Sequence, residues 1–420
     1  MKIQKIEIKN LFDQFDYDIP LTNPEDLLIL TAPNGFGKTM ILNIIDNLFN
    51  KKFWFFQKLV FDRITLWFEN DYKIEIKKYD SEKTDITLYD NQKKSTTYYY
   101  LQTDESKLDV IVNSLSKKFS FLAYWGDRLW FDNSSDEILD FEDIAKKYKL
   151  PSTIIDNYNK ISKYPDEFIA FFNLLSSHFI KEQRLFELYI EDYTITTLAK
   201  DLAEQIETVY LESGEISQTL DNTFPKRLLA EKQEITKKDF ISRFETLRQK
   251  QAKLHKFGLS ESEQEVPPYS EENAKLLSVY LNDIEKKIAV FDNLIQKLDL
   301  FTTILNERRF TFKTIEINKE KGFHFVTNKG KELSLTDLSS GEQHEVVLLY
   351  ELIFRTTSNT LVLIDEPEIS LHITWQKEFL KDLLAIIELQ KMQVIVATHS
   401  PSIINDRWDL VFNLQTQEMQ

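Results

Sequence analysis

The feature that most constrains the fold is an apolar run that ends in a short loop with two glycines and continues into an amphipathic stretch. LLILT is followed by APNGFGKT at residues 32–39 and then by MILNIIDNLF. This order predicts a buried strand, a tight loop and a helix. Glycines in such a loop let successive backbone N–H groups curl around a phosphate, while the Lys38 ammonium can reach phosphate oxygens and the Thr39 hydroxyl can bind Mg²⁺. The expected nucleotide-binding residues here are Asn34, Gly35, Phe36, Gly37, Lys38 and Thr39.

The alternative is an ordinary turn between a strand and a helix. The chain has 8 glycines among 420 residues, well below the usual share of about 7%. Three of them, Gly35, Gly37 and Gly341, fall in only two short loops. Ala32 replaces the first glycine of the usual pattern, but that position requires a small residue more than a positive φ. The concentration of a scarce residue favours the phosphate loop.

A second apolar run, LVLI, ends in two acidic residues, Asp365 and Glu366. Carboxylates at the end of a buried strand are costly unless they have a partner or a function, and open α/β sheets bind ligands at this end of their strands. We expect Asp365 to hold Mg²⁺ through water and Glu366 to orient and deprotonate a water molecule. A helix-capping role for Asp365 is the alternative. A third apolar run, VIVAT, ends in His399, which can sense a γ-phosphate from the same edge of the sheet.

The segment DLSSGEQHEVVLLYELIF predicts a helix that begins at Ser339, Ser340 and Gly341. Helix starts of this kind offer unpaired backbone N–H groups to an anion. The helix must pack back along the sheet, so its start is expected to point away from the chain's own phosphate loop. We therefore expect Ser339, Ser340, Gly341 and Glu342 to contact a nucleotide bound by a second copy of the chain.

Three segments are predicted along the chain: residues 1–130 and 309–420 as two parts of one α/β domain, and 131–308 as a helical insertion. Apolar residues alternate along 58–100, where LVFDRITLWF, a turn at Asn70–Asp71 and YKIEIKKY predict a β-hairpin within an antiparallel β-layer. Apolar residues at four- and three-residue spacing between Leu277 and Leu305 predict a coiled-coil seam of about four heptads. Its expected partner is a helix at 240–254, and an ordinary helical bundle is the alternative.

Composition excludes several classes of protein. There are no cysteines, which excludes disulfides and thiolate metal sites. No apolar run approaches the length needed to cross a bilayer, and the first residues lack the apolar stretch of a signal peptide; a cytoplasmic protein without membrane contact is expected. The net charge of −16 disfavours broad binding to nucleic acid. Residues 226–256 are locally basic, either as a DNA contact or, as we favour, as a solvated helix face with ion pairs.

In their order along the chain, Lys38-Thr39, LSSGEQ at 338–343, Asp365-Glu366 and His399 resemble the ABC-type ATPase heads of RecF-like and SMC-type proteins, within the AAA-family ATPases. The strings SSGEQHEVVLLYELIF, NTLVLIDEPEISLHITWQ and ATHSPSII are similar to the ATPase subunits of Septu-type anti-phage systems, the PtuA family. The resemblance covers about 1–50 and 300–412, and only loosely the middle of the chain. It implies an ABC-type α/β head, with an antiparallel β-layer and a helical, partly coiled-coil insertion.

The same resemblance implies ATP and Mg²⁺ as ligands, and head dimers within a larger homo-oligomer such as a hexamer. It also implies a separate nuclease effector such as an HNH protein. By position it assigns phosphate and metal binding to Lys38 and Thr39, action across the dimer to Ser339 and Gly341, metal binding to Asp365, the base to Glu366 and the switch to His399. The family often has Gln-Arg after the β-layer. Here Asp127-Arg128 stands there, which makes Asp127 a candidate metal ligand.

Four other functions are weighed. An ABC transporter subunit has its two motifs much closer together than Thr39 and Ser339 are here. A DNA repair ATPase of the RecF or SMC kind remains open, and it requires DNA to stimulate turnover. A nucleotide-locked scaffold, which binds ATP, barely hydrolyses it and holds the effector silent, also remains open. A nuclease in the same chain is disfavoured, because few residues follow His399 and the string Asp71, Glu75, Lys77 is too tightly spaced on an alternating strand.

Overall fold

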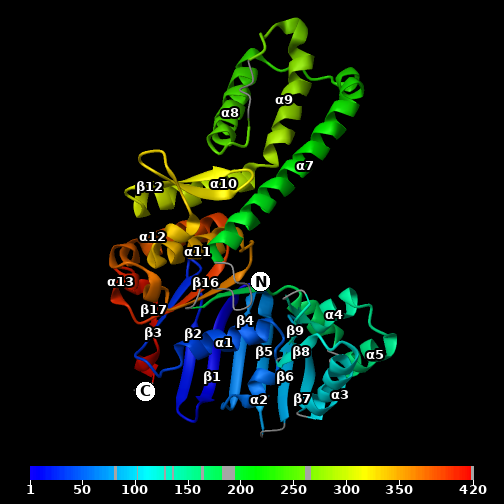
Figure 1. Ribbon diagram of the computed structural model, residues 1–420, viewed down its shortest axis with the longest axis vertical. Coiled ribbons are helices and arrows are strands. Elements are labelled where there is room, and N and C mark those ends of the chain that lie inside the picture. Colours follow the sequence, from blue (N-terminus) through cyan, green and yellow to red (C-terminus); the bar gives the residue numbers. More distant parts are fainter. Residues whose placement is uncertain are drawn as a thin grey trace. The chain divides into compact units, whose positions relative to one another are not determined.

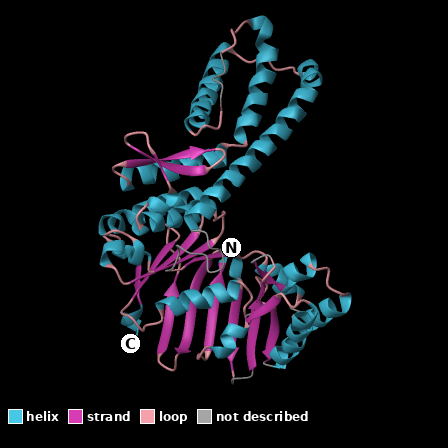
Figure 2. Ribbon diagram, viewed as in Figure 1, coloured by secondary structure: helices cyan, strands magenta, loops and turns pink. Residues whose placement is uncertain are grey.

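The computed structural model describes residues 1–79, 83–101, 103–126, 129–134, 137–161, 165–181, 194–260 and 266–417. Its contacts divide the chain into two compact units. The first unit comprises Met1–Glu191 and Thr356–Gln420, and the second comprises Asp192–Arg355. Figures 1 and 2 show the helices and strands of each.

The first unit is built on a parallel sheet with the strand order β11-β15-β16-β3-β17. These strands are β3 (Leu27–Thr31), β11 (Ser177–Ile180), β15 (Leu361–Asp365), β16 (Gln393–Thr398) and β17 (Val411–Asn413). Every residue of β15 and β16 is buried, which explains why these strands are apolar runs without alternation. Because all neighbours are parallel, their carboxyl ends meet at one edge. The predicted parallel sheet is confirmed.

Strand β11 lies where the sequence predicts a helical insertion. Its residues pair in register with β15, from Ser177 opposite Leu361 to Ile180 opposite Ile364. A second small sheet has the order β10-β9-β8. Its strands are β8 (Leu122–Gly126), before the predicted insertion, β9 (Leu129–Asp132), across its start, and β10 (Glu137–Asp140), inside it. The helical prediction does not hold for β10 and β11, because four residues are too few to show a period and the pairing of a strand depends on distant partners.

An antiparallel sheet with the order β2-β1-β4-β5-β6-β7 forms the predicted β-layer. Its strands are β1 (Ile3–Leu11), β2 (Phe15–Pro20), β4 (Arg63–Phe68), β5 (Lys73–Lys78), β6 (Lys83–Tyr89) and β7 (Ser95–Leu101). The predicted hairpin is confirmed: β4 pairs with β5, and Asn70 and Asp71 take the left-handed conformation with φ of 60° and 61°. Alternate residues of β2 are buried and exposed, as expected for a sheet with one covered face.

The helices of the first unit are α1 (Lys38–Phe49), α2 (Trp54–Lys58), α3 (Thr103–Lys118), α4 (Phe141–Lys147), α5 (Ser152–Ile161), α6 (Asp166–Phe172), α12 (Ile373–Gln390) and α13 (Pro401–Ile404). Helix α1 is buried on more than one face: Ile41, Leu42, Ile44 and Ile45 are all inaccessible to solvent. One core cluster joins these residues to strands of both the parallel sheet and the β-layer. This packing holds the first turn of α1, and with it the preceding loop, at the edge of the sheet.

The second unit contains the helices α7 (Thr194–Ala230), α8 (Lys237–Lys256), α9 (Ala274–Ala289), α10 (Asp292–Thr303) and α11 (Ser340–Phe354), and the strands β12 (Lys313–Asn318), β13 (Gly322–Thr327) and β14 (Glu332–Leu333). The three strands form an antiparallel sheet in the order β12-β13-β14. Strand β13 packs against α7. The contacts therefore group residues 309–355 with the helices, and not with the other α/β residues as the predicted segment 309–420 has it.

The predicted seam between Leu277 and Leu305 is not a single helix. Helix α9 ends at Ala289, α10 begins at Asp292, and a π-helical turn follows at Ile304–Arg309. The prediction of one continuous seam is therefore wrong, since apolar spacing can stay in phase across a break in the backbone. Its expected partner is confirmed, because α8 contacts α9, but the long helix α7 contacts α9 as well and was not expected.

Half of the basic residues predicted as a solvated face or a DNA contact form ion pairs within the second unit. Arg227 pairs with Asp283, Arg243 with Glu285, Lys250 with Asp292, and both Lys253 and Lys256 with Asp299. These pairs neutralise much of the local positive charge and favour the solvated-face interpretation. Among the described residues, no helix is both long enough and apolar enough to span a membrane.

Candidate nucleotide site

The loop between β3 and α1 has the backbone that a phosphate-binding loop needs. Gly35 and Gly37 have φ of +93° and +78°, a region that residues with a Cβ rarely adopt. A Cβ at Gly35 would have no heavy atom within 4 Å, so conformation and not crowding requires glycine there. The loop thus keeps an open face, beside the start of α1, on which an anion can approach backbone N–H groups.

Two side chains support the loop through hydrogen bonds to its backbone carbonyl oxygens. The Lys38 side chain is buried and its Nζ donates to the carbonyl oxygens of Ala32 at 2.9 Å and Pro33 at 3.5 Å. Tyr17 of β2 donates its hydroxyl to the carbonyl oxygen of Phe36 at 2.8 Å. Lys38 therefore already lies within the loop. Tyr17 is a supporting residue that sequence reasoning missed, because nothing in an alternating strand distinguishes it.

The structure brings Thr39 and Asp365 together, although 326 positions separate them. The Thr39 hydroxyl donates to Oδ1 of Asp365 at 3.2 Å. Asp365 is the last residue of β15 and is buried, whereas Thr39 is exposed at the start of α1. A hydroxyl next to a carboxylate is a donor set of hard oxygens, and Mg²⁺ bound with nucleotide phosphates prefers such ligands. Among the described residues, no cluster of three or more acidic, histidine or cysteine side chains could hold a metal alone.

Glu366 follows β15 in a strained conformation. Its φ is 42° and its ψ is 60°, the left-handed region, which costs a residue with a side chain about 1–2 kcal/mol. The conformation is held by the Glu366 N–H, which donates to the carbonyl oxygen of Ala397 at 2.9 Å. Strain of this kind gathers at functional sites, where it fixes the direction of a side chain.

His399 lies next to two carboxylates. Its Nδ1 is 3.5 Å from Oε1 of Glu366 and 3.1 Å from Oε1 of Glu368. The ring is half exposed, with 49% of its side-chain surface accessible, while Glu368 is buried. The structure therefore joins the predicted base and the predicted switch, and adds Glu368. Its only signal in the sequence is a third acidic residue, after Pro367, in the run DEPE.

The predicted turn at Ser339–Gly341 belongs to the second unit and begins α11. Ser339 and Glu342 form a capping box: the Ser339 hydroxyl accepts from the Glu342 N–H, and a Glu342 carboxylate oxygen accepts from the Ser339 N–H at 2.9 Å. Ser339 and Ser340 are exposed. Lys313 also pairs with Glu342 at 2.9 Å. Burial alone would raise the Glu342 carboxyl pKa, but its bonds to Lys313 and Ser339 outweigh that effect and lower it.

Glu342 thus supports the shape of this turn, and its contact with a nucleotide stays a prediction. Asp127, the predicted metal ligand in place of the usual glutamine, lies outside the described residues, as does Arg128.

Residues 1–404 match the AAA ATPase domain family. The chain belongs to this family. The predicted ATPase is confirmed at that level, and membership implies that this AAA ATPase binds a nucleotide. The match spans both units, so it places the loop at 32–39 and the turn at 339–341 within one family domain.

Similarity to solved structures is low. Two matches are the Smc head domain of Pyrococcus furiosus with an extended coiled coil, bound to the C-terminal domain of ScpA (15% identity, TM-score 0.33, 98% of this chain and 92% of that one), and the SMC head domain of Thermotoga maritima (12%, 0.33, 98% and 94%). A third is an SmcHead bound to the C-winged helix domain of ScpA (10%, 0.39, 98% and 94%). Likeness at this level does not decide function. A comparison with curated proteins found no match.

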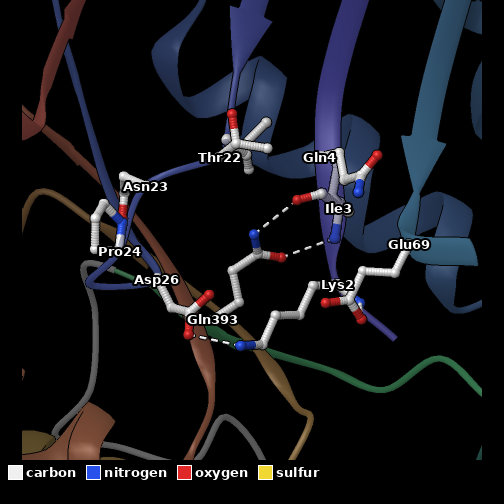
Figure 3. A pocket seen from close by; sticks show the side chains of 10 residues that line it. Lys2, Ile3, Gln4, Thr22, Asn23, Pro24, Asp26, Glu69 and Gln393 are labelled. Carbon is white, nitrogen blue, oxygen red and sulfur yellow. Dashed lines mark hydrogen bonds and ion pairs between the residues drawn. The ribbon is translucent and has the colours of Figure 1, made fainter.

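A separate cavity of about 360 Å³ lies at the opposite ends of the same strands (Figure 3). The Gln393 side chain, at the start of β16, bonds both the N–H and the carbonyl oxygen of Ile3, at 2.9 and 2.8 Å. Lys2 pairs with Asp26 at 2.6 Å. These contacts tie β1 to the parallel sheet, so we assign this cavity a structural role.

Proposed function

We propose that this ATPase hydrolyses ATP slowly in head dimers, and that it controls a separate nuclease effector in anti-phage defence. The observation that carries the catalytic part is the convergence of Lys38, Thr39, Asp365, Glu366 and His399 on one edge of the sheet in the first unit. The defence role rests on the resemblance to Septu-type ATPase subunits.

Each residue at the sheet edge has a distinct task in this proposal. The Lys38 ammonium and the N–H groups of the loop hold the β- and γ-phosphates. Thr39 and Asp365 would hold Mg²⁺, which neutralises phosphate charge when bound. Glu366 orients a water molecule and accepts its proton while the water oxygen bonds to the γ-phosphorus and the bond to ADP breaks. His399 contacts the γ-phosphate oxygens from the neighbouring strand end.

The dimer supplies the remaining contacts. The exposed turn at Ser339–Gly341 opens a helix of 15 residues, and the positive end of such a helix attracts an anion. We propose that this anion is the γ-phosphate held by the partner copy. Because Glu342 and Lys313 already brace the turn, it would meet the nucleotide without rearrangement.

Steady-state ATPase measurements test the catalytic proposal. We expect slow turnover that Lys38→Ala and Glu366→Gln each abolish. Glu366→Gln should still bind a fluorescent ATP analogue, because the amide keeps the size of the side chain and loses only its basicity. Turnover unaffected by Glu366→Gln removes that residue from the role of base.

Mixing two inactive variants tests whether the site is shared. Lys38→Ala and Ser339→Arg each destroy a different half of the proposed site. A mixed dimer has one site with both defects and one intact site, so turnover should return on mixing. If mixed dimers form by native mass spectrometry but stay inactive, the turn serves its own copy and the proposed dimer is wrong.

A phage-plating assay in cells and an ATPase assay with added DNA distinguish control of a nuclease effector from DNA repair. We expect the chain and its neighbouring nuclease gene to lower phage plating together, and Lys38→Ala to abolish protection. A repair ATPase instead predicts that DNA accelerates turnover. Half of the basic residues at 226–256 are paired with acids, which favours the first outcome. A scaffold without hydrolysis predicts protection that survives Glu366→Gln.

A further inference from the structure

The buried carboxylate of Glu368 makes contacts that its place in the sequence does not reveal. It lies on the short helix Pro367–Ser370 after β15. Its Oε1 accepts from the Thr398 hydroxyl at 2.6 Å and from the His399 N–H at 3.0 Å, and it is 3.1 Å from Nδ1 of the His399 ring. Among the described residues its Oε2 is buried and has no hydrogen-bond partner. Burial of a carboxylate is costly, so its contacts here indicate a role.

The chemistry of these groups determines where the imidazole proton lies. An ionised carboxylate only accepts hydrogen bonds, so a ring nitrogen that contacts one must carry a hydrogen. The Nδ1 of His399 contacts Glu368 at 3.1 Å and Glu366 at 3.5 Å. A hydrogen on Nδ1 is therefore favoured, and Glu368 is the nearer of its two carboxylates. Nε2, on the other side of this half-exposed ring, is then available to a ligand.

We propose that Glu368 is a positioning residue of the nucleotide site. It accepts the Nδ1 hydrogen of His399, fixes the tautomer and direction of the ring, and leaves the Glu366 carboxylate to the attacking water. The inference deepens the proposed ATP hydrolysis and rests on it. Without Glu368, the same hydrogen would turn to Glu366 and occupy the base.

A purely structural role would be to hold the turn around Glu368. The main chain of this turn has another anchor, however. The Gln376 side chain on α12 donates to the carbonyl oxygens of Glu368 at 3.2 Å and Leu371 at 3.0 Å. It also accepts from the Ser400 hydroxyl at 3.1 Å. Gln376 thus links the turn to the end of β16, and the Glu368 carboxylate adds the contact to the ring.

Kinetics of paired variants test the proposal. Glu368→Leu removes the acceptor, and we expect kcat to fall about 10–100-fold with little change in KM for ATP, as for other residues that orient a site. Glu368→Gln keeps an oxygen at the same place and should retain most of the activity. In the His399→Ala background, Glu368→Leu should add less than about a twofold loss, because its effect passes through the ring.

The matched control is Gln376→Leu, which weakens the anchor of the same turn without touching the ring. We expect it to lower Tm with less than about a threefold change in kcat, since the Glu368 contact persists. An equal loss from Glu368→Leu with and without His399, or full activity of Glu368→Leu, overturns the proposal.

A second measurement does not depend on turnover. Long-range ¹H–¹⁵N spectra of the histidine-labelled chain at about pH 8.5, above the ordinary range for imidazole, show which ring nitrogen carries hydrogen. The His399 signal, identified by its loss in His399→Ala, should show a protonated Nδ1. An unprotonated Nδ1 in the wild-type chain overturns the proposal. If the wild-type chain shows no ATPase activity, the proposed function fails, and this spectrum still decides the role of Glu368.

Discussion

Two glycines in the second unit have similar backbone angles but different surroundings. Alanine substitution at one of them would create a clash with the backbone, and the other serves as its control. Gly322, at the start of β13, and Gly330, before β14, have φ of +74° and +76°. An added Cβ at Gly322 would lie 1.8 Å from the carbonyl oxygen of Ala199 on α7, whereas at Gly330 no heavy atom lies within 4 Å. Alanine at either position costs about 1–2 kcal/mol for the left-handed conformation. Only Gly322→Ala adds overpacking, about 1–3 kcal/mol more.

We therefore expect Gly322→Ala to lower the free energy of unfolding by about 2–5 kcal/mol and Gly330→Ala by about 1–2 kcal/mol. The assay is urea unfolding, monitored by the circular dichroism signal of the helices. Hydrogen exchange of peptides from α7 measures the local stability of that helix. All six tryptophans lie in the first unit, so their fluorescence reports that unit separately. Equal losses for the two variants would refute the argument that the hairpin touches the α7 backbone.

Three further predictions concern buried charge and strain. Arg309 and Glu345 form an ion pair whose side chains are only 1% and 3% exposed. Arg309→Met should therefore lower the free energy of unfolding by about 3–5 kcal/mol, because it leaves a buried charge without a partner. The double variant with Glu345→Leu should recover most of that loss in urea unfolding. Burial alone would raise the pKa of the Asp132 carboxyl, but hydrogen bonds from Ser134, Tyr148 and Lys147 outweigh burial and lower that pKa. The ionised carboxylate therefore stabilises the fold above the ordinary carboxyl pKa, and this stabilisation is lost as pH falls. Because asparagine does not ionise, Asp132→Asn should flatten the decline of Tm below about pH 4. Glu366→Gly should raise stability by up to about 1–2 kcal/mol, since glycine removes the left-handed strain, and abolish turnover.

The main site residues could be predicted because each follows directly from a strand end. In a parallel sheet, the residues after LLILT, LVLI and VIVAT must share one edge, so the proximity of Thr39, Asp365 and His399 needed no knowledge of side-chain packing. The chemistry of each residue type then indicated a task. This reasoning used only local patterns and one general property of parallel sheets.

What the sequence could not show depends on single backbone angles and distant pairing. The left-handed conformation of Glu366 leaves no trace in residue type, because glutamate rarely adopts it. In the sequence, Glu368 cannot be distinguished from a solvent-exposed acidic residue. Only the pairing of β15 with β16 brings it next to His399. The break between α9 and α10 escaped because Leu277, Ile284 and Phe291 keep heptad spacing through it.

Helix α7 gives the second unit a mechanical property. Its 37 residues correspond to a rod about 55 Å long at 1.5 Å per residue. Near its first turns, Asp201 accepts a 2.6 Å hydrogen bond from Tyr350 of α11, and near its last turns Arg227 is clamped to Asp283 of α9. We therefore expect a small tilt of α11 to be carried along α7 as a larger displacement of its far end, where α7 contacts α9.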